Sequence, residues 1–162
     1  MAERYYPPVG FHFRVEFGLP GLESNDTRFS EVSGLTQKIG TTTLQEGGLN
    51  TYQHRLPQPE QYGNLVLKRG LNVASAVVLW CKAGIEFFQF VPIPVTVSLL
   101  NQDGIPLSIW EFVRCYPVQW SVSDLNAMDG KSYVVETLEL AYAYHYHQNI
   151  PTALPGALNG LF

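Results

Sequence analysis

The stretch YVVETLELAYAYHYH, residues 133–147, decides the fold class of this 162-residue chain. Its side chains alternate in character, as they do in a β-strand, where successive residues point to opposite sides. Mostly large apolar side chains occupy one face: Val134, Leu138, Leu140, Tyr142, Tyr144 and Tyr146. Small, polar or titratable ones occupy the other: Thr137, Glu139, Ala141, Ala143, His145 and His147. The pattern predicts one long, half-buried strand, in which Glu136 breaks the apolar face and needs a partner inside the fold.

Shorter stretches predict further strands on the N-terminal side. Residues 11–17 alternate strictly, and residues 95–100 alternate as they approach Asp103-Gly104, a strong hairpin-turn signal. We therefore expect residues 105–116 to return antiparallel, followed by a separate strand over residues 118–123. Two short strands are predicted over residues 29–33 and 64–69, and Gly34 ends the first of them. Residues 56–62 contain two prolines and are expected to form a loop.

One segment, residues 73–88, has the spacing of a helix, with Asn72 as its expected N-cap. Apolar side chains cover most of its circumference, which predicts a mostly buried helix. With the strands, it predicts a mainly β (β+α) fold: an antiparallel β-sandwich or barrel with one packed α-helix. We expect residues 1–162 to form a single domain, with residues 148–162 as a C-terminal extension. The tail over residues 150–162 is apolar but rich in Pro and Gly, and we expect it to dock on a neighbour.

Residues 37–55 show a different pattern. Thr41-Thr42-Thr43 favours β-structure and Gly47-Gly48 sits in the middle, so two strands joined at the glycines fit best. Few large apolar residues line either face of this hairpin. Because a two-stranded ribbon without a hydrophobic face is marginal in water, we expect the hairpin to lie on another subunit.

Composition favours a structural or binding role. The chain is 46% hydrophobic and 15% charged, and about 25% charged is usual, which suggests that neighbours cover part of its surface. Its net charge of −4 argues against sequence-specific nucleic-acid binding. No apolar run reaches the length of a membrane span and the N-terminus lacks an apolar leader, so we expect no membrane insertion and synthesis in the cytoplasm, with two reduced thiols.

Candidate catalytic and metal-binding groups carry little signal. His145 and His147 are two apart on a strand and would need a third ligand to hold a metal; histidines on a polar strand face are the simpler interpretation. Glu136 and Glu139 point to opposite faces of their strand and make no acid–base pair. Apolar neighbours of Cys115 indicate an inert, buried thiol. Phosphate-loop and dinucleotide glycine spacings are absent. We expect no catalytic residue, metal or cofactor.

The basic pair Lys68-Arg69 closes the strand before the helix. Ordinary solvated charge is one interpretation. The other is an ion pair between subunits, with an acidic residue such as Glu46.

The ordered series of motifs resembles the phage tail tube family. The resemblance runs from about Pro8 to Tyr146, nearly the whole chain, and rests on the series rather than on any single motif. The motifs are Pro8-Val9-Gly10-Phe11, residues 29–35 (FSEVSGL), Glu46-Gly47-Gly48 followed by Asn50, Tyr52, His54, Arg55, Leu56 and Pro57, and residues 64–70 (NLVLKRG) ahead of the helix with Trp80.

The resemblance implies a β-barrel-like protomer that forms six-membered rings, stacked into a hollow inner tube within a contractile sheath. Implied partners are the sheath protein, the baseplate hub, tube-initiator or terminator proteins, and a cargo of protein effector or DNA in the lumen. Such a chain is assembled into a phage tail or contractile injection particle. The lumen-lining candidates are Thr137 and Glu139, and the subunit-contact candidates are Glu46, Gly47, Gly48, Asn50, Tyr52, His54, Arg55, Lys68 and Arg69.

Alternatives remain open. The apolar tail from Ile150 onward favours the tube initiator, the similar ring protein that joins the tube to the baseplate hub. A metal-assisted hydrolase using His145 and His147 would need a bound metal, and a monomeric binding module would stay monomeric. For the tube, we expect Arg69→Glu or deletion of residues 43–51 to leave the monomer folded and block assembly.

Overall fold

The computed structural model describes residues 10, 12–22, 26–45, 47–48, 51–126, 128 and 133–150. Seven strands form one hydrogen-bonded sheet in the order β1-β6-β7-β8-β5-β2, with β9 also paired to β7, and β3 and β4 form a separate two-stranded sheet. The elements are β1 Phe13–Phe17, β2 Glu31–Ser33, β3 Lys38–Leu44, β4 His54–Gln61, β5 Leu65–Gly70, α1 Ala76–Phe87, β6 Ile93–Leu100, β7 Pro106–Val122, β8 Val135–Ala141 and β9 Tyr144–Asn149.

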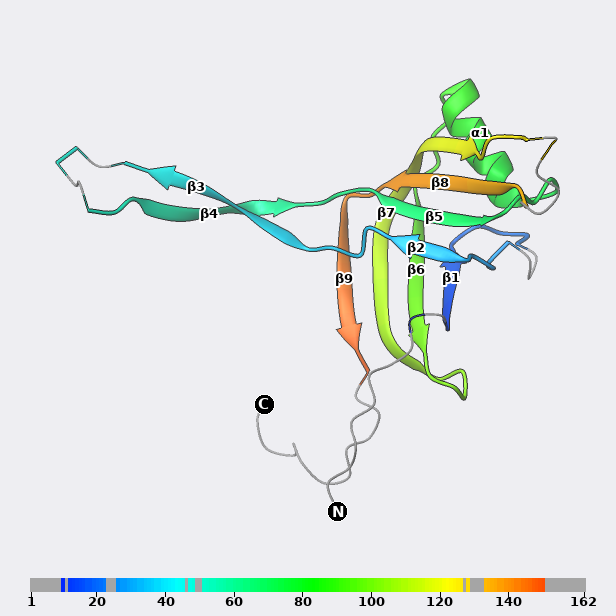
Figure 1. The fold of residues 1–162 in the computed structure, drawn as a ribbon, viewed down its shortest axis with the longest axis horizontal. Helices are drawn as coiled ribbons and strands as arrows, with labels where there is room; N and C mark the ends of the chain where they lie inside the picture. Colours follow the sequence, from blue (N-terminus) through cyan, green and yellow to red (C-terminus); the bar gives the residue numbers. More distant parts are fainter. Residues whose placement is uncertain are drawn as a thin grey trace, which may run out of the picture.

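Strand β7 joins the two layers of the fold. Its first part pairs with β6 and β9, and its last part, from Tyr116 onward, pairs with β8. Between them, Arg114 adopts a left-handed backbone with φ of 56°. In Figure 1, β1, β6 and β9 lie vertically, with β1 antiparallel to β6, whereas β8, β5 and β2 lie across them. The two separate strands expected over residues 105–123 are therefore one bent strand, because irregular pairing lets the chain turn without leaving the sheet.

The core lies between these layers and α1. It is built by alternation: Leu65 and Leu67 of β5 and Leu138 and Leu140 of β8 are all fully buried. The other layer contributes Val15, Val95, Val97 and Phe112, and the helix contributes Val77, Trp80 and Cys81. The mainly β, antiparallel fold with one packed helix is confirmed.

Gly34 fixes the turn that follows β2. Its φ is +92°, and a Cβ added there would lie 2.1 Å from the carbonyl oxygen of Asn64. Only glycine combines this conformation with so close a backbone approach. The glycine that the sequence marks as the end of the strand is thus required by packing.

The long strand expected over residues 133–147 is broken in two. After Ala141 the chain leaves β8, and Ala143 N–H donates to the carbonyl of Val113 on β7. Strand β9 then pairs with the other layer, where His145 lies opposite the fully buried Phe112. As a result His145 is buried, and the expectation that Tyr144 and Tyr146 continue the buried face is wrong.

The helix begins later than expected and is buried on one face only. Ser75, not Asn72, is the N-cap, and its hydroxyl accepts from the N–H of Val78 at 3.4 Å. The prediction of a mostly buried helix is wrong, because Leu79 and Phe87 project into solvent. No helix among the described residues has the length and apolar character needed to cross a bilayer.

The expected hairpin is present and projects far from the body of the protein (Figure 1). It pairs Leu44 with His54 near its tip and Lys38 with Gln61 at its base. The loop expected over residues 56–62 is mostly strand, since β4 continues through Pro57 and Pro59. Proline is tolerated because each strand of a two-stranded ribbon has a free edge.

Candidate assembly surfaces

The projecting hairpin carries most of the residues expected to contact other subunits. Gly47 and Gly48 form its turn, and Gly48 has a φ of +96°. Tyr52 is exposed and meets the ring of His54 edge-on, with centroids 5.3 Å apart. The Arg55 guanidinium donates to Thr41 Oγ1 at 3.2 Å across the two strands. Two further candidates, Glu46 and Asn50, lie outside the described residues.

Apolar side chains on the hairpin are left uncovered. Ile39, Leu44 and Leu56 are each about half exposed, at 59%, 49% and 46%. Within the described part of the chain, β3 and β4 pack on each other and make no substantial contact with another element. A lone ribbon of this kind gains little from its own packing, so these exposed side chains make the hairpin a candidate contact surface.

An aromatic cluster holds the base of the hairpin against the body. Tyr62, which follows β4, donates its hydroxyl to Glu60 and meets the ring of His145 at 5.4 Å between centroids. His145 in turn packs against Phe112 and Tyr142. Neither ring nitrogen of His145 has a hydrogen-bond partner among the described residues. Burial therefore lowers the pKa of His145, an effect that the nearby Glu60 carboxylate opposes.

Arg69 lies inside the protomer. Its side chain is 3% exposed, and its Nε donates to Glu136, which is fully buried. Trp120 Nε1–H donates to the other carboxylate oxygen at 3.3 Å. Arg69 is thus the partner that Glu136 needs. The alternative of an ion pair between subunits, with an acidic residue such as Glu46, is wrong for Arg69, because its guanidinium is enclosed in the core of the protomer.

The remaining contacts of Arg69 connect two more segments to this ion pair. One guanidinium nitrogen donates to the backbone carbonyl of Asp26 at 3.1 Å, and the other donates to Ser75 Oγ at 2.6 Å. The guanidinium also lies 5.1 Å from the centroid of the Phe29 ring. Ser75 is the helix N-cap, so one arginine links the loop before β2, strands β5 and β8, and the start of α1.

Lys68 has a different role from Arg69 because it points to the opposite face of β5. Its Nζ lies 2.8 Å from Glu31 Oε1 on the neighbouring strand β2, and both side chains are partly exposed. This pair lies within the protomer, at the surface.

Thr137 and Glu139 lie on a polar face of the sheet formed by β2, β5, β8 and the last part of β7. Side chains that point away from the core align in cross-strand rows on this face. One row is Ser33, Val66, Glu139 and Gln119, and the next is Glu31, Lys68, Thr137 and Ser121. Asn64 donates its side-chain amide to Glu139 at 2.6 Å. The face is polar, with its charges paired or hydrogen-bonded, and the sequence anticipated two of its members.

The two edge strands of this sheet each have an unpaired side among the described residues. In the described residues, β2 pairs with β5 on one side only, and the last part of β7 pairs only with β8. Their outer edges leave backbone N–H and C=O groups available for another strand.

The candidate catalytic groups are not assembled into a site. No group of three or more His, Cys, Asp or Glu side chains that could hold a metal is present among the described residues. His147 lies on the same face as His145 but stacks on Trp110, with centroids 4.8 Å apart. Burial raises the thiol pKa of both Cys81 and Cys115 to about 12, which leaves them unreactive at neutral pH.

Sequence reasoning missed two apolar surfaces. The first lies around the end of α1, where Leu79, Phe87, Phe88 and Val91 are strongly exposed. The second is a hollow between β1, β2, β6 and β7, described below. The surface at the end of α1 was missed because sequence periodicity predicts that apolar helix residues are buried. It does not show whether another element covers them.

These surfaces define the class of the protein: a β-sandwich structural protein with an extended hairpin. Comparison with known proteins agrees. The family model of the T4-like virus tail tube protein gp19 matches residues 9–145. The chain therefore belongs to the family of that tail tube protein, a family of structural tube proteins and not of enzymes. No curated protein sequence matches it.

Solved structures of contractile systems share the fold. A chain of the anti-feeding prophage baseplate, in a sixfold-symmetrised structure, is 27% identical, with a TM-score of 0.81; the match covers 91% of this chain and 99% of that one. A chain of an extracellular contractile injection system, the PVC sheath–tube complex, is 22% identical, with a TM-score of 0.75 and coverage of 90% and 93%. A chain of the anti-feeding prophage tube-terminating cap is 22% identical, with a TM-score of 0.76 and coverage of 93% and 100%. The protein is a tail tube protein of contractile systems.

Proposed function

We propose that this chain is the main subunit of the hollow inner tube of a contractile tail or injection system, forming six-membered rings that stack along an axis. The observation that carries the proposal is the hairpin, which projects from the body with Ile39, Leu44 and Leu56 uncovered. A neighbouring subunit or ring would cover these side chains. The sixfold symmetry of the baseplate that contains a 27% identical chain supports the ring size.

The polar sheet face is the proposed wall of the lumen. Its rows contain Ser, Thr, Gln, Glu139 and a Lys68–Glu31 pair, with Val66 as the one aliphatic member of the two rows. A wall of polar groups whose charges are paired or hydrogen-bonded offers no large apolar patch on which a passing cargo would stick. Thr137 and Glu139 are its central lining residues, on β8.

Ring closure is proposed to use the open edges of the same sheet. Strand β2 of one protomer would lie beside the last part of β7 of the next, a head-to-tail contact that closes after six copies. Pairing the edges also removes a site for uncontrolled aggregation. The hairpin would then form the second, open contact that stacks one ring on the next.

The proposed partners follow from this role. The sheath protein would surround the tube, and the baseplate hub and a terminator would bind its two ends. The cargo in the lumen would be a protein effector in an injection system or DNA in a phage. The particle, assembled from subunits made in the cytoplasm, is where the protein would act.

The tube-initiator ring is the second candidate. It is favoured by one observation, that a 27% identical relative comes from a baseplate structure. An initiator would form one ring that seats on the hub and accepts the main tube on its other face.

Negative-stain electron microscopy of the purified protein, with its mass in solution measured on the same sample, tests the proposal. Hexameric rings or tubes are expected. A strict monomer at all concentrations, also after addition of the baseplate hub, would overturn ring formation. Long tubes indicate the main subunit, whereas single rings that extend only after addition of a second tube protein indicate the initiator.

A further inference from the structure

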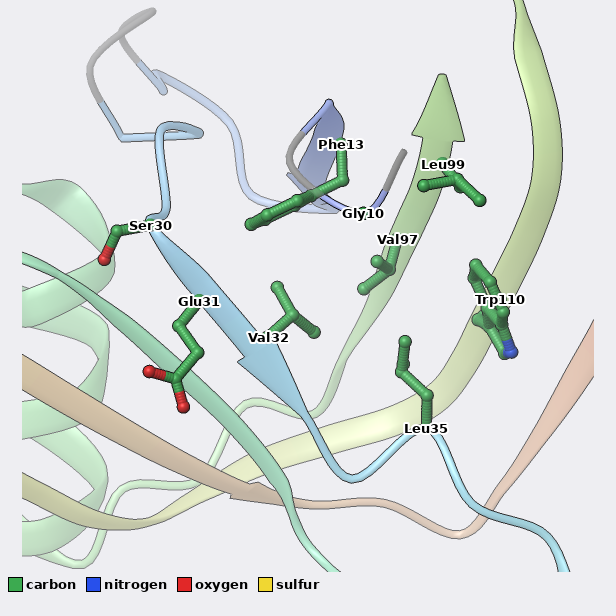
Figure 2. Close-up of a pocket in the computed structure, with 9 residues that line it drawn as sticks. All are labelled: Gly10, Phe13, Ser30, Glu31, Val32, Leu35, Val97, Leu99 and Trp110. Atoms are coloured by element: carbon green, nitrogen blue, oxygen red, sulfur yellow. The ribbon is translucent and has the colours of Figure 1, made fainter. Parts of the chain in front are cut away.

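A hollow of about 280 Å³ opens between the two layers, beside the edges of β1 and β2. Figure 2 shows the side chains of Phe13, Val97 and Leu99 on one side, with Val32 and Leu35 facing them. Trp110 lines one end of the hollow, and Glu31 points away on the other side of β2. The walls that face the hollow are therefore apolar.

The hollow arises because the two layers do not overlap completely. Phe13, Leu99 and Trp110 belong to the inner face of the layer formed by β1, β6, β7 and β9, and each is only partly buried. Small-molecule sites usually measure about 300–1,000 Å³ and contain convergent polar groups, whereas this hollow is smaller and its facing walls are apolar. Its size and chemistry suit one or two large aliphatic or aromatic side chains.

We propose that the occupant is the apolar C-terminal segment of the same chain, residues 151–162. The described part of the chain ends close to the hollow. Ile150 N–H donates to the carbonyl of Leu107, and Asn149 pairs with Ser108, which lies opposite the lining residue Leu99. Residues 151–162 carry no charged side chain. Their large apolar members are Leu154, Leu158, Leu161 and Phe162.

Reach and composition favour this segment over other occupants. Twelve extended residues span up to about 40 Å, and the hollow begins two residues along β7 from the exit point, at Trp110. The N-terminal segment enters beside the hollow at Gly10, but it carries Glu3 and Arg4, whose burial among apolar walls would be costly. The docking occurs within one chain, so it does not depend on the proposed tube.

Fluorine NMR of protein containing 5-fluorotryptophan tests the proposal. The chain has three tryptophans, and the resonance of Trp110 is assigned with Trp110→Phe. A chain ending at Ile150 is expected to show a shifted Trp110 resonance, with that of the core residue Trp80 unmoved. Replacing Thr152 and Asn159 by alanine is the matched control and should leave all three resonances in place. An unmoved Trp110 resonance in the shortened chain overturns the proposal.

A cross-link in the full-length chain gives a second test that does not require a shortened chain to fold. Leu35→Cys is combined with cysteine at Leu154, Leu158 or Leu161, while the native thiols stay unreactive because burial raises the pKa of Cys81 and Cys115 to about 12. A disulfide within one chain is expected for at least one pair, at every protein concentration. Disulfides only between chains would identify a second copy as the occupant. A Trp110 shift caused only by removal of residues 1–7 would identify the N-terminal segment; either result overturns the proposal.

Discussion

Arg69 and Glu136 form an ion pair in the core of the protomer. Both side chains are almost completely buried, and further hydrogen bonds from Trp120 and to Ser75 satisfy their remaining groups. Removing one partner of such a pair leaves a buried charge without compensation, which costs about 3–5 kcal/mol. Each partner therefore depends on the other, whereas replacing both together with apolar residues of similar volume is expected to be tolerated.

Arg69→Met is expected to lower the free energy of unfolding by about 3–5 kcal/mol, because Glu136 loses its counter-charge. Urea denaturation of the unassembled protein measures the loss. Lys68→Met is the matched control and should change stability by less than about 1 kcal/mol, since the Lys68–Glu31 pair is at the surface. Arg69→Glu is expected to prevent folding, in place of the selective loss of assembly that the sequence suggested. Equal effects of the two methionine substitutions would contradict this account.

The buried imidazole of His145 predicts that the folded protein loses stability at acidic pH. Its pKa is lowered in the folded state by burial, so below its ordinary pKa of about 6.5 the unfolded chain binds the proton more readily. Stability is then fully present above about pH 6.5 and falls as the pH drops below that value. We expect the protein to lose more free energy of unfolding between about pH 7.5 and 5.5 than His145→Phe does. Parallel pH dependence of the two proteins would refute the assignment.

At the scale of elements, α1 ends on a residue in a strained conformation. Phe88 is the C-cap, with φ of 54°, and its side chain is 83% exposed. Glycine is preferred at such left-handed caps.

Phe88→Gly is therefore expected to stabilise the unassembled protein by about 1 kcal/mol, since it relieves the left-handed strain. Thermal denaturation measures the gain. Leu79→Gly, another exposed apolar residue but in the helix interior, should instead destabilise by about 1 kcal/mol. A loss of stability in both variants would show that Phe88 contributes packing that outweighs its strain.

The hairpin is expected to contribute to assembly and not to protomer stability. Deleting residues 43–51 removes the tip and leaves the paired base and Tyr62 in place. The melting temperature of the monomer should change little, whereas rings or tubes should disappear from electron micrographs. A matched change in the Asp103-Gly104 turn to Asn-Gly should affect neither. Normal tubes from the deletion variant would remove the hairpin from the proposed interface.

At the scale of the whole molecule, the layer formed by β2, β5, β8 and the last part of β7 has one face on the apolar core and one polar face. If that face lines the lumen, its accessibility should depend on assembly and on the size of the reagent. Thr137→Cys is expected to react with both a small and a polymer-linked maleimide in the monomer, and mainly with the small one in tubes. Thr96→Cys, in the other layer, is the control for general loss of reactivity. Full labelling of Thr137→Cys tubes by the large reagent would place this face outside the lumen.

Strands and turns could be predicted from the sequence where they depend only on residues close together in the chain. Strand β1, the hairpin at Gly47-Gly48 and the turn at Asp103-Gly104 follow from two-residue periodicity and turn chemistry alone. The break between β8 and β9 could not, because alternation continues through Tyr142-Ala143 in the sequence while the chain changes layers there. The error at β7 was the opposite one, since the sequence indicated two strands where the chain forms a single bent strand through Arg114.

The contacts of the candidate residues also fall into those that the sequence predicts and those that only the tertiary structure shows. That Glu136 needs a partner follows from one acidic residue on an apolar strand face. The prediction that the hairpin contacts a neighbour likewise rests on local sequence, because few large apolar residues line either of its faces. The identity of the partner, Arg69, and the burial of His145 depend on which strands lie side by side, and such pairing involves residues far apart in the chain. Periodicity reports which side of its own strand a residue occupies. Only the packing of the layers determines what lies on that side: core, solvent or another chain.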